Sequence, residues 1–178
     1  MRLAQPDWLM HRLSVSGRAS EVAAFRQTAS GSGIVPWWWD YDAMAQDWFH
    51  MLMAAPQRHI SAAGSRLLAH AVCDAVRAGH DRLASQQDRP LCPFDLNALR
   101  PVPPALLRRG PDDPASLDWL WRHWGTTWPL RRVEVLVPEP EYFCCSFCAA
   151  DWTPWPILAS LRRRFQALRI DMTPLYDT

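Results

Sequence analysis

The strongest constraint on the fold is a pair of alternating segments in the C-terminal half. Residues 131–137 and 141–149 alternate apolar and polar side chains, which is the period of a half-buried β-strand. Only Pro138-Glu139-Pro140 separates them, so they predict an antiparallel hairpin. The expected inward face holds Val133, Val135, Val137, Phe143, Cys145 and Phe147, and the reverse face holds Arg132, Glu134, Cys144, Ser146 and Cys148.

Further segments on either side complete a known pattern. Leu9 to Ser16 alternates in the same way and stops at Gly17, and Ser20 is placed to cap a helix after it. Beyond the hairpin, a helix carries Ile157, Leu158, Leu161 and Phe165, and a last strand turns Leu168, Ile170 and Met172 inward. The order predicts an α+β protein with a ferredoxin-like βαββαβ antiparallel sheet and a helical insertion after the first helix.

The length of 178 residues suits a single domain. Residues 1–30 would hold the first strand and helix, 36–90 the helical insertion, and 92–178 the rest of the ferredoxin-like part. In the insertion, one helix is expected from Asp42 to Ala54 and a longer one opens at Ser61, with an apolar face of Leu67, Leu68, Ala71, Val72, Ala75 and Val76.

The segment between the insertion and the hairpin contains two predicted parts. Pro90 to Pro114 is rich in proline and lacks periodicity, so we expect an extended connector on the surface. Ala115 to Trp124 predicts a short helix, because Pro114 precedes it and Gly125 follows it. Its tryptophans are expected in the core.

Composition favours a cytoplasmic globular protein. The chain is 49% apolar and 21% charged with a formal net charge of +1, so no global field attracts nucleic acid or anionic lipid. No run approaches the ~18 apolar residues of a membrane span, and residues 1–7 lack the apolar stretch of a signal peptide. We therefore expect no membrane partner, and five cysteines that are reduced thiols.

Three groups of residues in the C-terminal half resemble a known family. They are Cys92-Pro93-Phe94-Asp95-Leu96-Asn97 with Pro101-Val102-Pro103, then Trp124-Gly125-Thr126-Thr127-Trp128, and Asp151-Trp152-Thr153-Pro154-Trp155-Pro156. They resemble the YubB-like family of uncharacterised plasmid, phage and bacterial proteins, over roughly Cys92 to Tyr176, with a weaker echo in residues 13–17. The resemblance implies a C-terminal ferredoxin-like domain and a mobile-element context, and it carries no activity. Thr127 stands where the family usually has Lys, and Trp155 where a second Pro is common.

The cysteines give little support for catalysis or metal binding. A strand would place Cys144 and Cys148 about 13 Å apart, too far to share one tetrahedral ion, so we expect no metal and no other cofactor. A nucleophilic cysteine needs a positioned base, and no local signature pairs one with His11, His50, His59, His70, His80 or His123. His70, Cys73, Asp74 and Arg77 share one helix, which is typical of a solvated face with one buried thiol. A small Cys/His enzyme is the third hypothesis.

The eleven tryptophans are the unusual feature of the composition. Trp37, Trp38 and Trp39 are consecutive and cannot all face inward, and exposed tryptophans are typical of binding hot spots. The leading hypothesis is a non-catalytic interaction module that holds a protein partner or a second copy of itself. The alternative for these three is that they pack the insertion on the sheet. The candidate binding residues are Trp37, Trp38, Trp39, Trp124, Thr126, Thr127, Trp128, Arg131, Arg132, Trp152 and Trp155.

The second hypothesis is nucleic-acid binding by an accessory protein of a mobile element or defence system. Ferredoxin-like sheets can stack RNA bases on aromatic side chains of their central strands. Here the predicted open face offers one aromatic, among Arg12, Ser14, Ser16, Tyr142, Cys144, Ser146 and Cys148. Arginines at 108–109, 131–132 and 162–164 could contact phosphate, although the last group also suits the solvated face and negative end of a helix.

Overall fold

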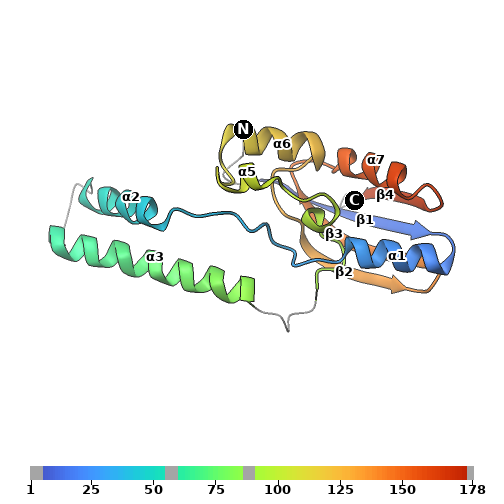
Figure 1. Ribbon diagram of the computed structural model, residues 1–178, viewed down its shortest axis with the longest axis horizontal. Helices are drawn as coiled ribbons and strands as arrows, with labels where there is room; N and C mark the ends of the chain where they lie inside the picture. Colours follow the sequence, from blue (N-terminus) through green and yellow to red (C-terminus); the bar gives the residue numbers. More distant parts are fainter. Residues whose placement is uncertain (1–5, 55–59, 86–90, 176–178) are drawn as a thin grey trace. The chain divides into compact units, whose positions relative to one another are not determined.

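The computed structural model describes residues 6–54, 60–85 and 91–175 (Figure 1). The chain divides into two compact units, Met1–Trp37 with Pro90–Thr178, and Trp38–Arg89. The larger unit contains a β-sheet, and the smaller contains two helices. Among the described helices, none combines the length and the apolar character that crossing a membrane would need.

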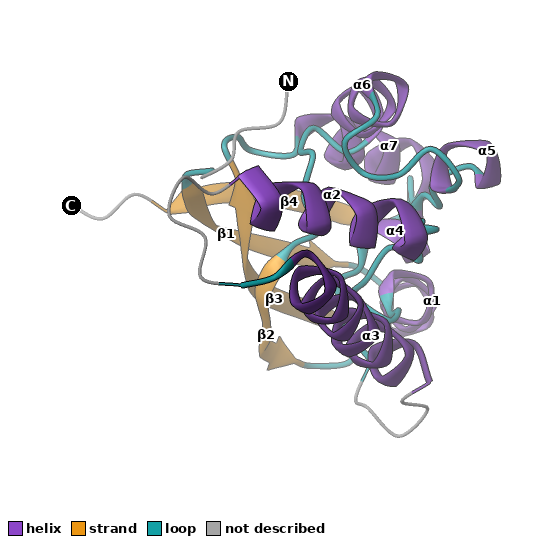
Figure 2. Cartoon of the chain, turned by 90° about the vertical axis from the view of Figure 1, so that its left-hand side faces the viewer, coloured by secondary structure: helices purple, strands orange, loops and turns teal. Residues whose placement is uncertain are grey.

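A four-stranded antiparallel sheet lies at the centre of the larger unit. Its strands are β1 (Trp8–Ser16), β2 (Arg131–Pro138), β3 (Tyr142–Ala150) and β4 (Arg169–Leu175), in the order β2-β3-β1-β4. Helix α1 (Ala19–Ala29) follows β1, and helix α7 (Trp155–Arg164) joins β3 to β4. This is the ferredoxin-like order, so the predicted fold class is confirmed. Figure 2 shows α1 and α7 on the same side of the sheet.

The core lies between these two helices and one face of the sheet. Because side chains alternate along a strand, every second residue of β1, β3 and β4 is buried on this face, as the sequence predicts. Phe25 of α1 joins the sheet and α7, with ring centroids 6.1 Å from Phe143 and 5.3 Å from Phe165. The inward-facing residues are Leu13, Val15, Phe143, Cys145, Phe147, Ile170 and Met172, covered by Val22, Phe25, Ile157, Leu158 and Leu161.

Strand β2 departs from the predicted alternation. Its register shifts twice against β3, between Arg131 and Glu134 and between Val135 and Val137. Each shift adds an unpaired residue, which reverses the faces beyond it. Val137 therefore lies opposite Cys144 on the reverse face, and its predicted inward position is wrong.

Helix α1 begins before its predicted cap. Arg18 occupies the N-cap position, and no described side chain caps the helix there. Ser20 lies within the first turn, so the prediction that it caps the helix is wrong. Glu21 also lies in the first turn, where its negative charge is favoured by the helix dipole.

Residues 91–113 contribute to the core, so the predicted surface connector is wrong. They contain two one-turn helices, α4 (Leu96–Leu99) and α5 (Pro104–Leu107). Four apolar side chains of this segment are buried: Phe94, Leu96, Leu99 and Val102. Leu96 and Leu99 share one side of the single turn of α4, and Phe94 and Val102 lie in the irregular segments before and after it. None of these segments is long enough to show a repeating period in the sequence.

Polar contacts of Asp95 fix the start of this segment. Its carboxylate accepts hydrogen bonds from Asn97 N at 2.8 Å and Gly33 N at 3.0 Å. Nearby, Gly31 and Cys92 exchange two backbone hydrogen bonds of 3.0 and 2.7 Å. Within the larger unit, the segments that precede and follow residues 38–89 are therefore held to each other.

Helix α6 (Pro114–His123) starts and ends within one residue of the predicted bounds, Ala115 to Trp124. Asp113 caps its N-terminus, with the side-chain carboxylate accepting from Ala115 N at 2.9 Å. At the other end Trp124 is the C-cap, and Gly125 follows it with a positive φ of +83°. The expectation that its tryptophans are all in the core is wrong, because Trp121 is 49% exposed.

The smaller unit consists of α2 (Tyr41–Ala54) and α3 (Ala62–Ser85), which pack on each other. Helix α3 opens next to Ser61, close to the predicted start, and the Ser61 Oγ accepts from Gly64 N at 3.1 Å. The buried positions of α3 are the small residues Ser65, Ala69 and Cys73, one turn apart. The predicted apolar face instead lies largely outward, with Leu67 74% exposed, because small side chains let the two helices approach closely.

The polar group on α3 has the predicted character. His70, Asp74 and Arg77 are exposed, and Cys73 is buried. The Arg77 guanidinium lies 4.6 Å from the centre of the Tyr41 ring, so it joins the two helices of this unit.

Replacing Gly79 by alanine should stabilise α3. No heavy atom of the described residues lies within 4 Å of an added Cβ, and alanine loses less backbone freedom than glycine in a helix. We expect a gain of about 1 kcal/mol, measured as a higher thermal midpoint by circular dichroism. Gly64→Ala is the matched control, because its Cβ would lie 2.9 Å from Ile60 Cγ1 and offset the gain. A lower midpoint for Gly79→Ala would contradict the prediction.

Candidate functional site

The Trp124–Thr126 segment joins α6 to the sheet. The Trp124 ring is 1% exposed, and its Nε1 donates to the Arg100 carbonyl at 3.0 Å. Gly125 N donates to the carbonyls of Leu120 and Trp121. Thr126 is buried, and its hydroxyl donates to the Ala150 carbonyl at the end of β3, at 3.3 Å. These contacts give the segment a packing role in the fold.

The Asp151–Pro156 segment is held to the start of β1. Asp151 N donates to the Asp7 carbonyl at 2.7 Å, and Asp7 N donates to the Asp151 carboxylate at 3.1 Å. The Thr153 hydroxyl is buried 3.0 Å from Nε2 of His11. With the backbone fixed in this way, Trp152 and Trp155 point outward, 58% and 47% exposed.

His11 is buried on the core face of β1 as a neutral ring. Its Nδ1 lies 2.8 Å from the Leu9 carbonyl, which can only accept, so this nitrogen carries the proton. Its Nε2 then accepts from Thr153, and the ring stacks on Phe147 with centroids 5.2 Å apart. Burial lowers the pKa of His11 below its usual value of 6.5, and the bond to Leu9 partly opposes this shift.

Acidification should therefore destabilise the protein through His11. Its folded pKa lies below the unfolded value, so its contribution to stability is complete above about pH 6.5 and declines as the pH falls toward the folded pKa. We would compare urea unfolding of the wild type and His11→Gln at about pH 7.5 and about pH 5.5. At about pH 7.5 the variant should have a lower free energy of unfolding than the wild type, and this free energy should fall less between about pH 7.5 and about pH 5.5. Burial also lowers the pKa of His123, but this residue is present in both proteins, so equal losses would count against the role of His11.

The cysteines lie in positions that disfavour a thiolate. Cys73, Cys144, Cys145 and Cys148 are buried, and Cys92 is half-buried. Burial raises the pKa of Cys145 to about 12, with a smaller contribution from Cys144 and Cys92. Within residues 6–54, 60–85 and 91–175, no three His, Cys, Asp or Glu side chains gather as metal ligands would. His59, one of the candidate bases, lies outside the described residues.

We expect Cys145 to react slowly with alkylating reagents. A thiol whose pKa is about 12 holds almost no thiolate at neutral pH, and its position on the core face excludes reagent. Iodoacetamide added to the folded protein should label the half-buried Cys92 before Cys145, as peptide mass spectrometry would show. Rapid labelling of Cys145 would revive the hypothesis of a cysteine enzyme.

A groove of about 460 Å³ opens beside α6. Its lining residues are Pro114, Leu117, Asp118, Trp121 and Thr127. The Asp118 carboxylate forms an ion pair with Arg122 at 2.9 Å, so its negative charge is neutralised within the protein. The start of α7 adjoins this region, because a Cβ on Gly125 would lie 2.5 Å from Pro156 Cδ. We call Leu117, Trp121, Thr127, Trp152 and Trp155 the tryptophan surface.

A hollow of about 620 Å³ lies at one end of the reverse face of the sheet, and we call it the sheet pocket. The Arg131 guanidinium lies 4.1 Å from the centre of the Trp8 ring and 6.0 Å from that of Trp128. The two tryptophan rings meet edge to face at 6.4 Å. The pocket is lined by Trp8, Leu9, Met10, Arg131, Arg132, Cys148 and Leu175.

The sheet pocket contains two of the candidate residues, Arg131 and Arg132, and a third, Trp128, lies beside it against Trp8, a residue that the sequence did not single out. Trp8 was missed because the predicted strand began at Leu9, one residue too late. The signal was present, since Trp8 has the same phase as Met10 and Arg12, and side chains two apart share a face.

The consecutive tryptophans lie where the two units join in sequence. Trp37 is buried, Trp38 is 65% exposed and Trp39 is half-buried. The prediction that the three cannot all face inward is confirmed.

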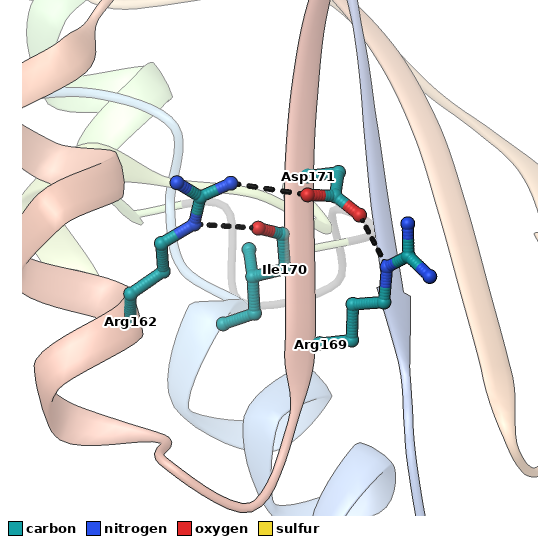
Figure 3. A network of polar contacts seen from close by, with 4 residues as sticks. All are labelled: Arg162, Arg169, Ile170 and Asp171. Carbon is teal, nitrogen blue, oxygen red and sulfur yellow. Dashed lines mark hydrogen bonds and ion pairs between the residues drawn. The ribbon is translucent and has the colours of Figure 1, made fainter.

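Two arginines of α7, Arg162 and Arg164, have side-chain partners within the fold, and Figure 3 shows those of Arg162. Arg162 donates to the Ile170 carbonyl at 2.8 Å and to the Asp171 carboxylate at 3.0 Å, and Arg169 donates to the other oxygen of Asp171 at 2.8 Å. The hydrogen bond from Arg169, followed by the charges of both arginines, lowers the pKa of Asp171. Arg164 donates to the Leu99 carbonyl at 3.3 Å, so residues 162–164 act as the solvated, bracing face of their helix.

Fold and surfaces together define an α+β protein with a ferredoxin-like sheet, a two-helix insertion and several exposed aromatic side chains. No family model matches the sequence, and no curated protein matches it. Among solved structures, the chain is similar to the protein api92 from Yersinia pseudotuberculosis, of the family model DUF1281. The two are 11% identical, with a TM-score of 0.51, over 96% of this chain and 90% of that one. At this identity the likeness supports the fold alone.

Proposed function

We propose that this chain is a non-catalytic protein-interaction module of the YubB-like kind, which binds a partner protein through the tryptophan surface. The observation that carries the proposal is the exposure of Trp121, Trp152 and Trp155 on adjoining segments of the larger unit. Large aromatic rings in water leave apolar area uncovered, and such rings anchor the centres of protein interfaces.

The groove beside α6 suits an apolar anchor from the partner. Pro114, Leu117 and Trp121 provide apolar walls, and Asp118 is already paired with Arg122. The hydrogen bonds of Asp151 and Thr126 fix the backbone on either side, so little ordering would accompany binding. Trp38, exposed in the insertion, is a second contact in this proposal.

Two matched double variants test the proposal. Tagged wild type, Trp121→Ala/Trp155→Ala and Trp38→Ala/Trp48→Ala would be purified from the native host at physiological salt after nuclease treatment. Each hot-spot side chain contributes about 2 kcal/mol or more, so the first variant should recover at least roughly ten-fold less of a specific partner protein. The thermal midpoints should stay close to that of the wild type, because these rings are exposed.

The second variant tells the two surfaces apart. The proposal would be contradicted if Trp38→Ala/Trp48→Ala lost the partner completely while Trp121→Ala/Trp155→Ala still recovered it at the wild-type level. The partner would then bind the insertion and not the tryptophan surface. Light scattering would show whether the partner is a second copy: a dimer that dissociates only in the Trp121→Ala/Trp155→Ala variant would identify it as one.

A further inference from the structure

We propose that the reverse face of the sheet binds a single strand of nucleic acid, anchored at the sheet pocket. This face is formed by every second residue of β1, β3 and β4, opposite the face covered by α1 and α7. It shares no residue with the tryptophan surface, so the inference is independent of the proposed protein partner.

The sheet pocket combines a stacked arginine with an apolar floor. Arg131 lies over Trp8, with Trp128 beside it, and this stacking holds the guanidinium in place while its N–H groups stay free to donate. Met10 and Leu175 are partly exposed and offer a flat apolar contact. A nucleotide matches both features, because its base stacks on apolar, aromatic or guanidinium planes and its phosphate binds arginine.

The charges of the pocket are available to a phosphate. Neither Arg131 nor Arg132 forms an ion pair with a carboxylate of the described residues. By contrast, Arg109 pairs with Asp113 and Arg162 with Asp171. In the groups at 108–109 and 162–164 one arginine is thus paired with a carboxylate, whereas both arginines at 131–132 keep their charge for a ligand.

A polar path continues from the pocket along the central strands. The path follows Arg12, Ser14 and Ser16 of β1 and the residues paired with them on both sides. The partners on β3 are Ser146, Cys144 and Tyr142, and those on β4 are Thr173, Asp171 and Arg169. From Met10 to Ser16 the path is about 20 Å long at the usual rise of a strand. It begins at Trp8 on β1 and ends at Tyr142 on β3, and these two strands are the central pair of the sheet.

Ferredoxin-like sheets stack two or three bases on aromatic side chains of their central strands, and here Trp8 and Tyr142 lie at the two ends of that strand pair. The acid on the path is compensated, because Asp171 is held between Arg162 and Arg169 (Figure 3). Arg12, Arg131, Arg132 and Arg169 outweigh Glu134 and Asp171 among the strands of the sheet, even though the whole chain is nearly neutral. Charge complementarity therefore favours a polyanion over an apolar peptide on this face.

Fluorescence anisotropy with the full chain tests the inference. The probes would be labelled single-stranded uridine and thymidine oligomers of about 12 nucleotides, with a duplex of equal length for comparison. We expect the single strands to bind more tightly than the duplex, and Kd to rise about 5- to 20-fold between about 50 and about 200 mM salt, as two or three phosphate contacts would give.

Single substitutions locate the binding face. Arg131→Gln and Arg12→Gln should each weaken binding by roughly ten-fold, and the control Arg163→Gln, on the exposed face of α7, should leave Kd unchanged. Circular dichroism would confirm that the three variants are folded. Absence of binding by the wild type, or binding that survives both Arg131→Gln and Arg12→Gln, overturns the inference. Competition by uridine monophosphate as strong per molecule as by the oligomer also overturns it, because the ligand would then be a free nucleotide.

Discussion

Replacing Trp124 by alanine is expected to lower the free energy of unfolding by about 3–5 kcal/mol, the usual loss when a large buried ring is removed from a core. Almost none of the Trp124 ring is exposed, and the ring also packs edge to face on Trp119 at 6.0 Å. Its Nε1 is the hydrogen-bond donor to the Arg100 carbonyl, which the variant would leave buried without that partner. Urea unfolding followed by circular dichroism would measure the loss, and the thermal midpoint should fall by roughly 10 °C.

Two further variants show whether burial causes the effect. Trp124→Phe keeps most of the apolar contact and removes the indole N–H, so its loss should be about 1–3 kcal/mol. Trp155→Ala removes the same side chain from the surface and should stay within about 0.5 kcal/mol of the wild type. Similar losses for Trp124→Ala and Trp155→Ala would mean that the two rings do not differ in burial as described.

The next largest effect is expected for Gly125→Ala, which should destabilise the protein by about 3 kcal/mol from two sources. The backbone at Gly125 has φ +83°, and a side chain in that region adds roughly 1–2 kcal/mol of strain. The added Cβ would also lie 2.5 Å from Pro156 Cδ and 3.1 Å from Pro154 Cα, and overpacking of this kind costs about 1–3 kcal/mol. Urea unfolding would again give the change.

Gly110 is a matched control for the backbone term. Its φ is +88°, and no heavy atom of the described residues lies within 4 Å of an added Cβ. Gly110→Ala should therefore show only the strain of about 1–2 kcal/mol. The difference between the two variants measures the contact of Gly125 with residues 154–156, and equal losses would show that this contact is unimportant.

The sequence predicts the fold well where one face of an element is buried. The alternation in β1, β3 and β4 gave the correct inward residues, because a strand between core and solvent must alternate. In β2, two bulges interrupt the alternation, so Val137 lies on the reverse face instead of the predicted core face. Phe94 and Val102 were missed for a different reason: local bends between prolines, and no period, turn them inward.

Candidate sites are harder to predict than elements, because the exposure of a side chain depends on distant segments. Trp121 lies on α6 and Trp124 is its C-cap, yet Trp124 is buried and bonded to the Arg100 carbonyl while Trp121 is half exposed. On α3, the spacing of apolar residues in the sequence predicts an amphipathic helix. Only the packing against α2 shows that Ala69 and Cys73 are buried and that Leu67 is not. The exposure of Trp152 and Trp155 likewise depends on Asp7, which is 144 residues from Asp151 in the chain.

The two edges of the sheet restrict how other chains can approach it. Residues 133–137 of β2 are apolar except for Glu134, and such β-prone segments can add to the edge strands of neighbouring molecules and start aggregation. Two bulges, the left-handed backbone of Arg132 and the terminal Pro138 interrupt its free row of hydrogen-bonding groups. On the other edge, Pro174 removes an N–H group from β4. Both edges are thus poor templates for an added strand, so we expect a partner to bind through side chains and the protein to resist fibril growth when it is concentrated.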